Sequence, residues 1–183
     1  PVSAALMVGL DEKSTTTGKF LGLNAIYKTD RFSVGAGYNT RKNELGQKSL
    51  TSALVGATVN IGPGTAVGHY AVVTDDNPTG LSSIVASLTP LTGAATALVV
   101  QNAFVKAAKQ DSRLYHVGYR LPLGSHKFHV AYTYLDDRLG SNSDTASYGA
   151  VYSYAFSKRT DLNVALTHFN NKNLAQAAPG QAG

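Results

Sequence analysis

Apolar and polar residues alternate along most of this sequence, in segments of about ten residues. In the segment YSYAFS, at residues 152–157, aromatic side chains alternate with small ones, and residues 160–167 repeat the pattern. An alternation with a period of two predicts a β-strand that presents two different faces. We expect nine such strands, at residues 2–10, 19–29, 32–41, 49–61, 65–74, 112–121, 127–135, 145–156 and 160–170. The sequence therefore predicts an all-β, antiparallel fold.

The expected strands and their connections have lengths that favour a membrane-spanning barrel. Strands in soluble proteins usually contain about five or six residues, whereas about ten tilted residues cross a hydrocarbon layer. Short connections, at residues 29–31, 62–64, 122–125 and 157–159, alternate with long polar ones, at residues 11–18, 42–48, 75–111 and 136–144. A transmembrane β-barrel has this asymmetry, because one rim carries short turns and the other carries long loops.

The distribution of charge gives a second reason to prefer a transmembrane β-barrel to a soluble sheet. Only 15% of the residues are charged, against about 25% in an average globular protein. Residues 49–74 and 145–157 contain no Asp, Glu, Lys or Arg, although soluble antiparallel sheets usually carry charge on their exposed face. The apolar face would then meet lipid, and the face rich in Gly, Ser, Asn and Thr would line an aqueous lumen. For residues 65–74 the sequence leaves open which face points outward.

Tyrosines lie near the ends of several expected strands. A ring with a polar hydroxyl suits the interface between hydrocarbon and water, so we expect a lipid-facing belt of tyrosines. A simple preference of tyrosine for strands is the alternative explanation. The expected belt contains Tyr27, Tyr38, Tyr115, Tyr119, Tyr132, Tyr134, Tyr152 and Tyr154.

Basic residues gather on the expected inner face near the short connection at residues 122–125. His116 and Arg120 share this face of one strand, and Lys127 and His129 share it on the next. A basic patch on the wall of a pore would attract anions, whereas charge that is merely solvated near a turn would have no such role. The candidate pore-lining residues are His116, Arg120, Lys127, His129 and Asn163.

Several other functions lack the residues that they require. Cysteine is absent, which excludes disulfides, thiol catalysis and thiolate metal sites. His116 and His129 have no third ligand at a suitable spacing, so we expect no metal. Neither a nucleophile motif nor a phosphate loop indicates an enzyme or a cofactor. The net charge of +5 is not concentrated in a basic run, which argues against a nucleic-acid partner.

The hairpin YGAVYSYAFSKRTDLNVALTHFNN, at residues 148–171, resembles the penultimate hairpin of the general porins of the Gram-negative outer membrane. RFSVGAGYN, at residues 31–39, and KFHVAYTYLDD, at residues 127–137, are similar to other strands of these barrels. The resemblance covers essentially the whole chain and is most specific at SKRTDL. It implies a homotrimeric, sixteen-stranded porin in the outer membrane, in contact with lipid and lipopolysaccharide, through which small hydrophilic solutes diffuse passively.

The chain departs from these porins in its number of strands. Its nine strands would correspond to strands seven to fifteen, and the sequence ends at APGQAG without the closing strand and its terminal aromatic residue. It begins at Pro1 with neither a Met nor a signal peptide, so we expect a mature form or a piece of a longer chain. We therefore interpret residues 1–183 as part of a porin-like barrel, in which the constriction loop and most of the trimer surface are absent.

Residues 75–110 form the longest expected connection, which we assign to the external side. Within it, the Ala-rich residues 94–109 predict either a short, weakly amphipathic helix or an irregular lid. The acidic pairs at residues 75–76 and 136–137 open external loops. They would either hold divalent cations between lipopolysaccharide phosphates or simply be solvated.

The sequence leaves two other functions open besides a passive diffusion porin with a mild preference for anions. A small, self-contained outer-membrane barrel would act as an adhesin or a structural anchor, but side chains must fill the lumen of such a barrel. The small inward residues found here would leave it full of holes. A soluble β-domain that binds a ligand is the other alternative.

Overall fold

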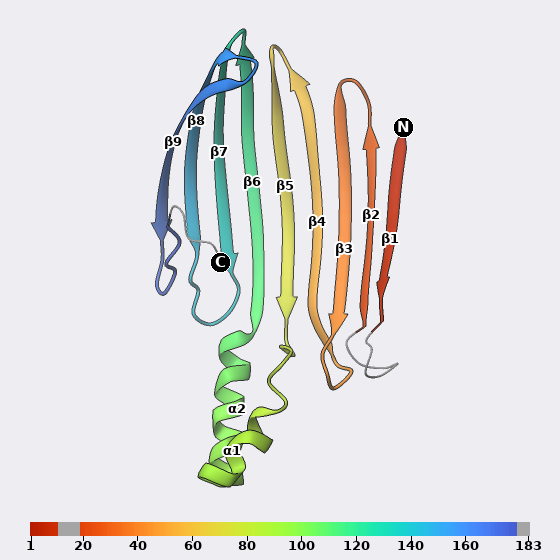
Figure 1. The fold of residues 1–183 in the computed structure, drawn as a ribbon, viewed down its shortest axis with the longest axis vertical. Helices are drawn as coiled ribbons and strands as arrows, with labels where there is room; N and C mark the ends of the chain where they lie inside the picture. Colours follow the sequence, from red (N-terminus) through yellow and green to blue (C-terminus); the bar gives the residue numbers. More distant parts are fainter. Residues whose placement is uncertain (11–18, 179–183) are drawn as a thin grey trace.

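The strands of the computed structural model form one antiparallel sheet, and the structure describes residues 1–10 and 19–178 (Figure 1). The strands are β1 (Val2–Gly9), β2 (Phe20–Lys28), β3 (Phe32–Lys42), β4 (Lys48–Ile61), β5 (Gly64–Asp75), β6 (Gln110–Leu123), β7 (His126–Asp137), β8 (Thr145–Ser157) and β9 (Thr160–Asn171), and the helices are α1 (Ile84–Thr92) and α2 (Ala94–Ala108). Strands adjacent in the sequence are adjacent in the nine-stranded sheet, whose order is β1 to β9. All nine expected strands are present, and the antiparallel all-β fold is confirmed.

The strands are long enough to cross a membrane, and the sheet that they form is open. Strands β4 to β9 contain 12 to 14 residues each. At about 3.3 Å per residue and a barrel tilt of about 40°, such strands rise about 30 to 35 Å, which is enough for the roughly 30 Å of a hydrocarbon layer. Within the described residues, β1 pairs only with β2 and β9 only with β8, so both edges of the sheet lack a partner.

The described residues of the sheet form a single layer, which has no hydrophobic core. The substantial contacts between elements in the described part of the chain join neighbouring strands, or α1 with α2. Among the described residues, Ala97 in α2 is the only buried hydrophobic one, whereas Val55, Val117 and Val130 of the sheet are exposed. A soluble domain packs at least two layers together to remove its apolar side chains from water. This architecture therefore argues against the soluble β-domain that the sequence left open.

Tight turns gather at one end of the sheet, called the turn end, and longer connections at the other, called the loop end (Figure 1). Gly62 and Gly124 begin the β4–β5 and β6–β7 turns with positive φ angles of 58° and 61°, which a residue without a Cβ adopts at little cost. Gly64 leaves room for the Tyr119 hydroxyl, which donates a 2.9 Å hydrogen bond to a backbone carbonyl of β4. The connections alternate as the sequence predicts, and the expected long connection at residues 11–18 lies outside the described residues.

The β5–β6 connection carries both helices, which lie beyond the loop end (Figure 1). The sequence predicted either a short helix or an irregular lid at residues 94–109, and the structure has helix α2 there. Helix α1 is an addition to the sequence-based expectation, because Pro90 lies inside it and weakens any helical signal. Gly93, with a φ of 79°, separates the two helices. Neither helix has the length and apolar character needed to cross a membrane, and the same holds for every helix among the described residues.

Candidate functional site

The strand registers divide the side chains of the sheet between two faces, because residues that pair directly across an antiparallel ladder lie on the same face. Tyr70 pairs with Tyr115, which in turn pairs with Tyr134, and the other ladders continue this face across the sheet. All ten tyrosines lie on it: Tyr27, Tyr38, Tyr70, Tyr115, Tyr119, Tyr132, Tyr134, Tyr148, Tyr152 and Tyr154. We call it the apolar face, and the opposite one the polar face.

The apolar face carries no charged side chain over most of its height. Among the described residues of the strands, Asp, Glu, Lys and Arg reach this face only at the loop end, where Arg113 and Asp136 are register partners. On β7, Asp136 lies ten residues beyond His126, and the side chains of this face before Asp136 include no Asp, Glu, Lys or Arg. Ten residues of strand measure about 33 Å, and a barrel tilt of about 40° turns this into a band about 25 Å tall. That is the height of the apolar band on a transmembrane β-barrel.

The polar face is the more enclosed of the two. In β6, Tyr115 and Val117 on the apolar face are exposed. His116 and Gly118, which alternate with them on the polar face, are half-buried. Strands β3, β4 and β8 show the same alternation. A one-layer sheet that curves toward its polar face would crowd the side chains on that face. This is the curvature that would place the polar face inside a barrel.

All five candidate pore-lining residues lie on the polar face. Arg120 pairs with His129, and Lys127 pairs with Ser153, which pairs in turn with Asn163. Asn163 accepts a hydrogen bond from Ser153 and donates one of 3.0 Å to Asp161. The structure thus gathers the four basic candidates on adjacent strands β6 and β7, with Asn163 two strands away on β9.

The register also brings a residue to this face that the sequence did not assign. His69 of β5 pairs with His116 and stacks on its ring, with the ring centroids 4.5 Å apart. The sequence left the faces of β5 open, because both of its alternating sets contain apolar residues. The pairing of Tyr70 with Tyr115 decides it, since this places Tyr70 on the apolar face and His69 on the polar face.

At the loop end, residues of the β3–β4 connection form hydrogen bonds with the part of the β5–β6 connection that precedes α1. The Glu44 carboxylate accepts hydrogen bonds of 2.9 to 3.1 Å from the backbone amides of Gly80 and Ser82. Partial burial raises the pKa of Glu44, but the amides bonded to its charged form outweigh this and lower the pKa to about 2. Asn43 donates a further hydrogen bond of 3.3 Å to the carbonyl of Asn77. The start of the β5–β6 connection is therefore fixed to the β3–β4 connection.

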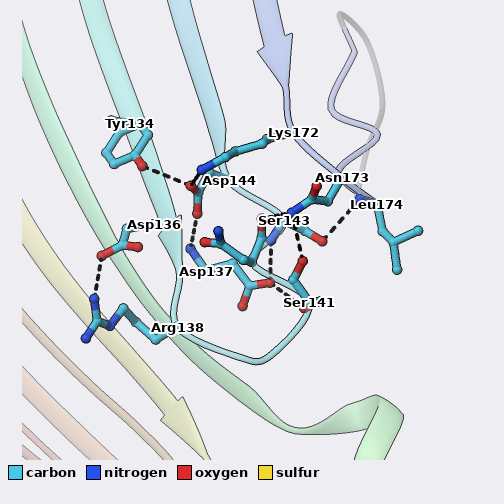
Figure 2. A network of polar contacts seen from close by, with 11 residues as sticks. Tyr134, Asp136, Asp137, Arg138, Ser141, Ser143, Asp144, Lys172, Asn173 and Leu174 are labelled. Atoms are coloured by element: carbon cyan, nitrogen blue, oxygen red, sulfur yellow. Dashed lines mark hydrogen bonds and ion pairs between the residues drawn. The ribbon is translucent and has the colours of Figure 1, made fainter.

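A second polar network joins the β7–β8 connection to the residues that follow β9 (Figure 2). Asp144 accepts hydrogen bonds from Lys172 at 3.0 Å and from Tyr134 at 3.1 Å. The ammonium of Lys172 lowers the pKa of the Asp144 carboxyl, and Asp144 in turn raises the pKa of Lys172. Asn173 donates to the carbonyls of Ser141 and Asn142.

Three of the four carboxylates in the acidic pairs at the loop end, those of Asp75, Asp136 and Asp137, have protein partners, whereas Asp76 is exposed. Asp75 accepts a hydrogen bond from Ser49, and Asp136 forms an ion pair with Arg138. Asp137 accepts hydrogen bonds from Ser141 and from the backbone of the β7–β8 connection. Among the described residues, no group of three or more His, Cys, Asp or Glu is arranged to hold a metal ion. The contacts of these carboxylates thus favour a structural role over cation binding.

A sequence profile of the family described as Gram-negative porin matches residues 1–174. The chain belongs to the Gram-negative porin family. The family accordingly places this porin in the outer membrane. No curated protein matches the sequence.

Solved porin structures share this fold. The anion-selective porin from Comamonas acidovorans is similar with a TM-score of 0.66 and 17% sequence identity, over 93% of this chain and 46% of that one. A porin refined at 1.8 Å resolution is similar with a TM-score of 0.61 and 14% identity, over 94% of this chain and 53% of that one. The chain thus spans about half the length of these porins, and at such identities the likeness concerns the fold alone.

Proposed function

We propose that the nine strands form part of the wall of a larger barrel, through which small hydrophilic solutes diffuse passively across the outer membrane. The observation that carries this proposal is the division of the sheet into two faces. One face has every tyrosine and an uncharged band about 25 Å tall, and the other has small polar and basic side chains. Lipid would cover the apolar face, and water would fill the space in front of the polar face.

The open edges support a barrel larger than these nine strands. An unpaired strand edge exposes backbone amides and carbonyls, which the hydrocarbon layer does not tolerate. Strands β1 and β9 therefore require further strands as partners, in keeping with porins of about twice this length. The complete barrel would assemble as a homotrimer, in contact with lipid and lipopolysaccharide. The two helices of the β5–β6 connection would lie on the external side, near the mouth of the pore.

The basic residues of the polar face would give this pore a mild preference for anions. Arg120 and Lys127 lie on this face of adjacent strands, and both are exposed. Their charges would raise the local concentration of anions in the lumen. Because the lumen is wet, added salt would weaken the preference, as the Debye length falls to about 3 Å at 1 M.

Reversal potentials of the complete porin in planar bilayers test this proposal. In a salt gradient at low ionic strength, R120E/K127E should shift the reversal potential toward cations, and the shift should shrink at high salt. R31E/R159E is the matched control, because it reverses two charges within the tight turns at the turn end. An unchanged reversal potential in R120E/K127E, or an equal shift in the control, would contradict an anion preference set by Arg120 and Lys127.

A further inference from the structure

Three of the five histidines of the chain gather on the polar face, on three adjacent strands. The rings of His69 and His116 stack with an angle of 16° between their planes. His129 extends over Gly118 from the other side, since its Nε2 lies 3.3 Å from the position that a Cβ on this glycine would occupy. Gly118 thus leaves the space into which the His129 ring extends, on the same face as the stacked pair. We call His69, His116 and His129 the histidine cluster.

The charged groups nearest to the histidine cluster are positive. Arg120 is the register partner of His129, and Lys127 lies on the same face two residues before it. The residues that pair with the cluster from the flanking strands are uncharged: Gly56 of β4 faces His69, and Val151 of β8 faces His129.

Carboxylates lie on the polar face only at a distance from the histidine cluster. Asp75 is six residues along β5 from His69, and Asp137 is eight residues along β7 from His129, which places both about 20 Å or more away. Asp161 belongs to β9, two strands beyond β7. A positive charge gained by the cluster would therefore have no nearby partner of opposite sign within the described sheet.

We infer that the histidine cluster is a proton-dependent site for small anions in the pore wall, and that it strengthens the anion preference as the pH falls. This inference rests on the proposed function, because it requires the polar face to line the lumen. Imidazole is the ordinary side chain whose charge changes between pH 5 and 8. Each protonated ring adds a positive charge beside Arg120 and Lys127, where halide, phosphate or carboxylate groups would be attracted from the lumen.

A contact of His116 explains how the site can change its charge without rearranging the wall. Its Nδ1 lies 2.8 Å from Oγ1 of Thr133 on β7. A hydroxyl both donates and accepts hydrogen bonds, so Thr133 can bond to His116 whether or not this nitrogen carries a proton. The expected response to pH is therefore a change in selectivity and not a closure of the channel.

The test is the anion-to-cation permeability ratio of the complete porin in planar bilayers, measured at pH 8 and pH 5 in low salt. A unit charge about 10 Å from a passing ion changes its local concentration by roughly a factor of two in water. The wild-type ratio should therefore rise roughly two- to fourfold between pH 8 and pH 5. H69Q/H116Q/H129Q should lose this rise but keep the ratio at pH 8, which depends on Arg120 and Lys127.

The two remaining histidines provide a matched control. His126 and His168 lie on the apolar face, so H126Q/H168Q should retain the full rise between pH 8 and pH 5. Wild-type conductance at pH 8 shows that a variant has folded. If the triple variant fails to fold, H69Q and H129Q alone should each reduce the rise.

The outcomes separate this inference from the proposed function. A wild-type ratio that is independent of pH, a folded triple or single variant with the full rise, or a control without it would overturn the histidine site. A cation preference at pH 8 together with a histidine-dependent rise would contradict the proposed anion preference but support the site. A complete porin without any conductance would contradict both.

Discussion

The strand part of β7 and the connection that follows it, residues 138–144, differ in what stabilises them. Along the strand, apolar-face side chains such as Val130 are exposed, and the backbone ladders to β6 and β8 supply the contacts. In the connection, by contrast, the Asp144 carboxylate is surrounded by donors, and Asp144 is only 5% exposed. Both ion pairs of the described residues, Arg138–Asp136 and Lys172–Asp144, lie at this end of the sheet.

This difference shows how the two regions depend on their surroundings. The strands between the turn end and the loop end, called the wall, owe their arrangement to lipid on one side and water on the other. An apolar side chain is favoured on the face toward lipid, and a small polar one is accommodated on the face toward water. The loop end owes its arrangement to specific hydrogen bonds between connections. A substitution in the wall should therefore act through the face that it occupies, whereas one at the loop end should act through the partner that it removes.

The largest effect is expected from a charge on the apolar face of the wall. Val164 and Asn163 are neighbours in β9 that lie on the apolar and polar faces, respectively. Val164→Arg should destabilise a complete barrel by roughly 2–4 kcal/mol, since it brings a guanidinium into lipid near the midplane, and Asn163→Arg should cost far less. Urea unfolding in phospholipid vesicles measures both. Equal losses at the two positions would show that the faces have been assigned the wrong way round.

The wall was largely predictable from the sequence, because alternation and turn length are local signals. Tyr152 and Tyr154, for example, are separated by one small residue and lie before a tight turn, which together define both a face and a hairpin. The faces of β5 were not predictable, because Val67, Ala71 and Val73 look as apolar as Ala66 and Val72. Only the pairing of β5 with β6 shows which side chains share a face. The sequence alone therefore did not predict that His69 lies on the polar face.

The loop end was not predictable, because its contacts join residues far apart in the sequence. Glu44 and Gly80 are separated by 36 positions, and Asp144 and Lys172 by 28. No periodic pattern marks such partners, since each depends on the arrangement of two connections in space. Asp137 is different, because its carboxylate accepts hydrogen bonds from residues 139–143 of the β7–β8 connection. The sequence predicted only that it belongs to an acidic pair that is either solvated or binds cations.

Removal of a buried partner at the loop end should have the next largest effect. The Ser49 hydroxyl donates to the Asp75 carboxylate at 3.1 Å, and the two residues are only 3% and 7% exposed. Ser49→Ala should destabilise the barrel by about 2 kcal/mol, because a buried carboxylate loses a donor. Ser52→Ala, in the wall part of the same strand, is the matched control and should change the free energy of unfolding little. A loss at Ser52 as large as that at Ser49 would contradict the contrast between wall and loop end.

A smaller effect is expected where the polar face of the wall is locally crowded. A Cβ on Gly118 would lie 3.1 to 3.3 Å from the backbone of β7 and the side chains of Val67 and His129, whereas a Cβ on Gly149 would have no atom within 4 Å. Gly118→Ala should therefore cost roughly 1 kcal/mol through overpacking. Gly149→Ala should be neutral or slightly stabilising, because it restricts the unfolded chain. Equal free energies of unfolding for the two variants would show that the wall is uniformly open on this face.

The smallest effect is a local opening of the loop end in acid. The pKa of Glu44 falls from its ordinary value near 4.5 to about 2, so the stabilisation that its charge provides is complete above pH 4.5 and is lost as the pH falls toward 2. Pepsin is active over this range, and it should cut the wild-type protein within residues 76–83 at pH 2 but spare this segment at pH 4. Glu44→Ala should allow the cut at both pH values, because Gly80 and Ser82 lose their acceptor. Asp76→Asn, which changes an exposed carboxylate nearby, should behave as the wild type does. Equal cleavage of Glu44→Ala and wild type at pH 4 would show that Glu44 does not hold this segment in place.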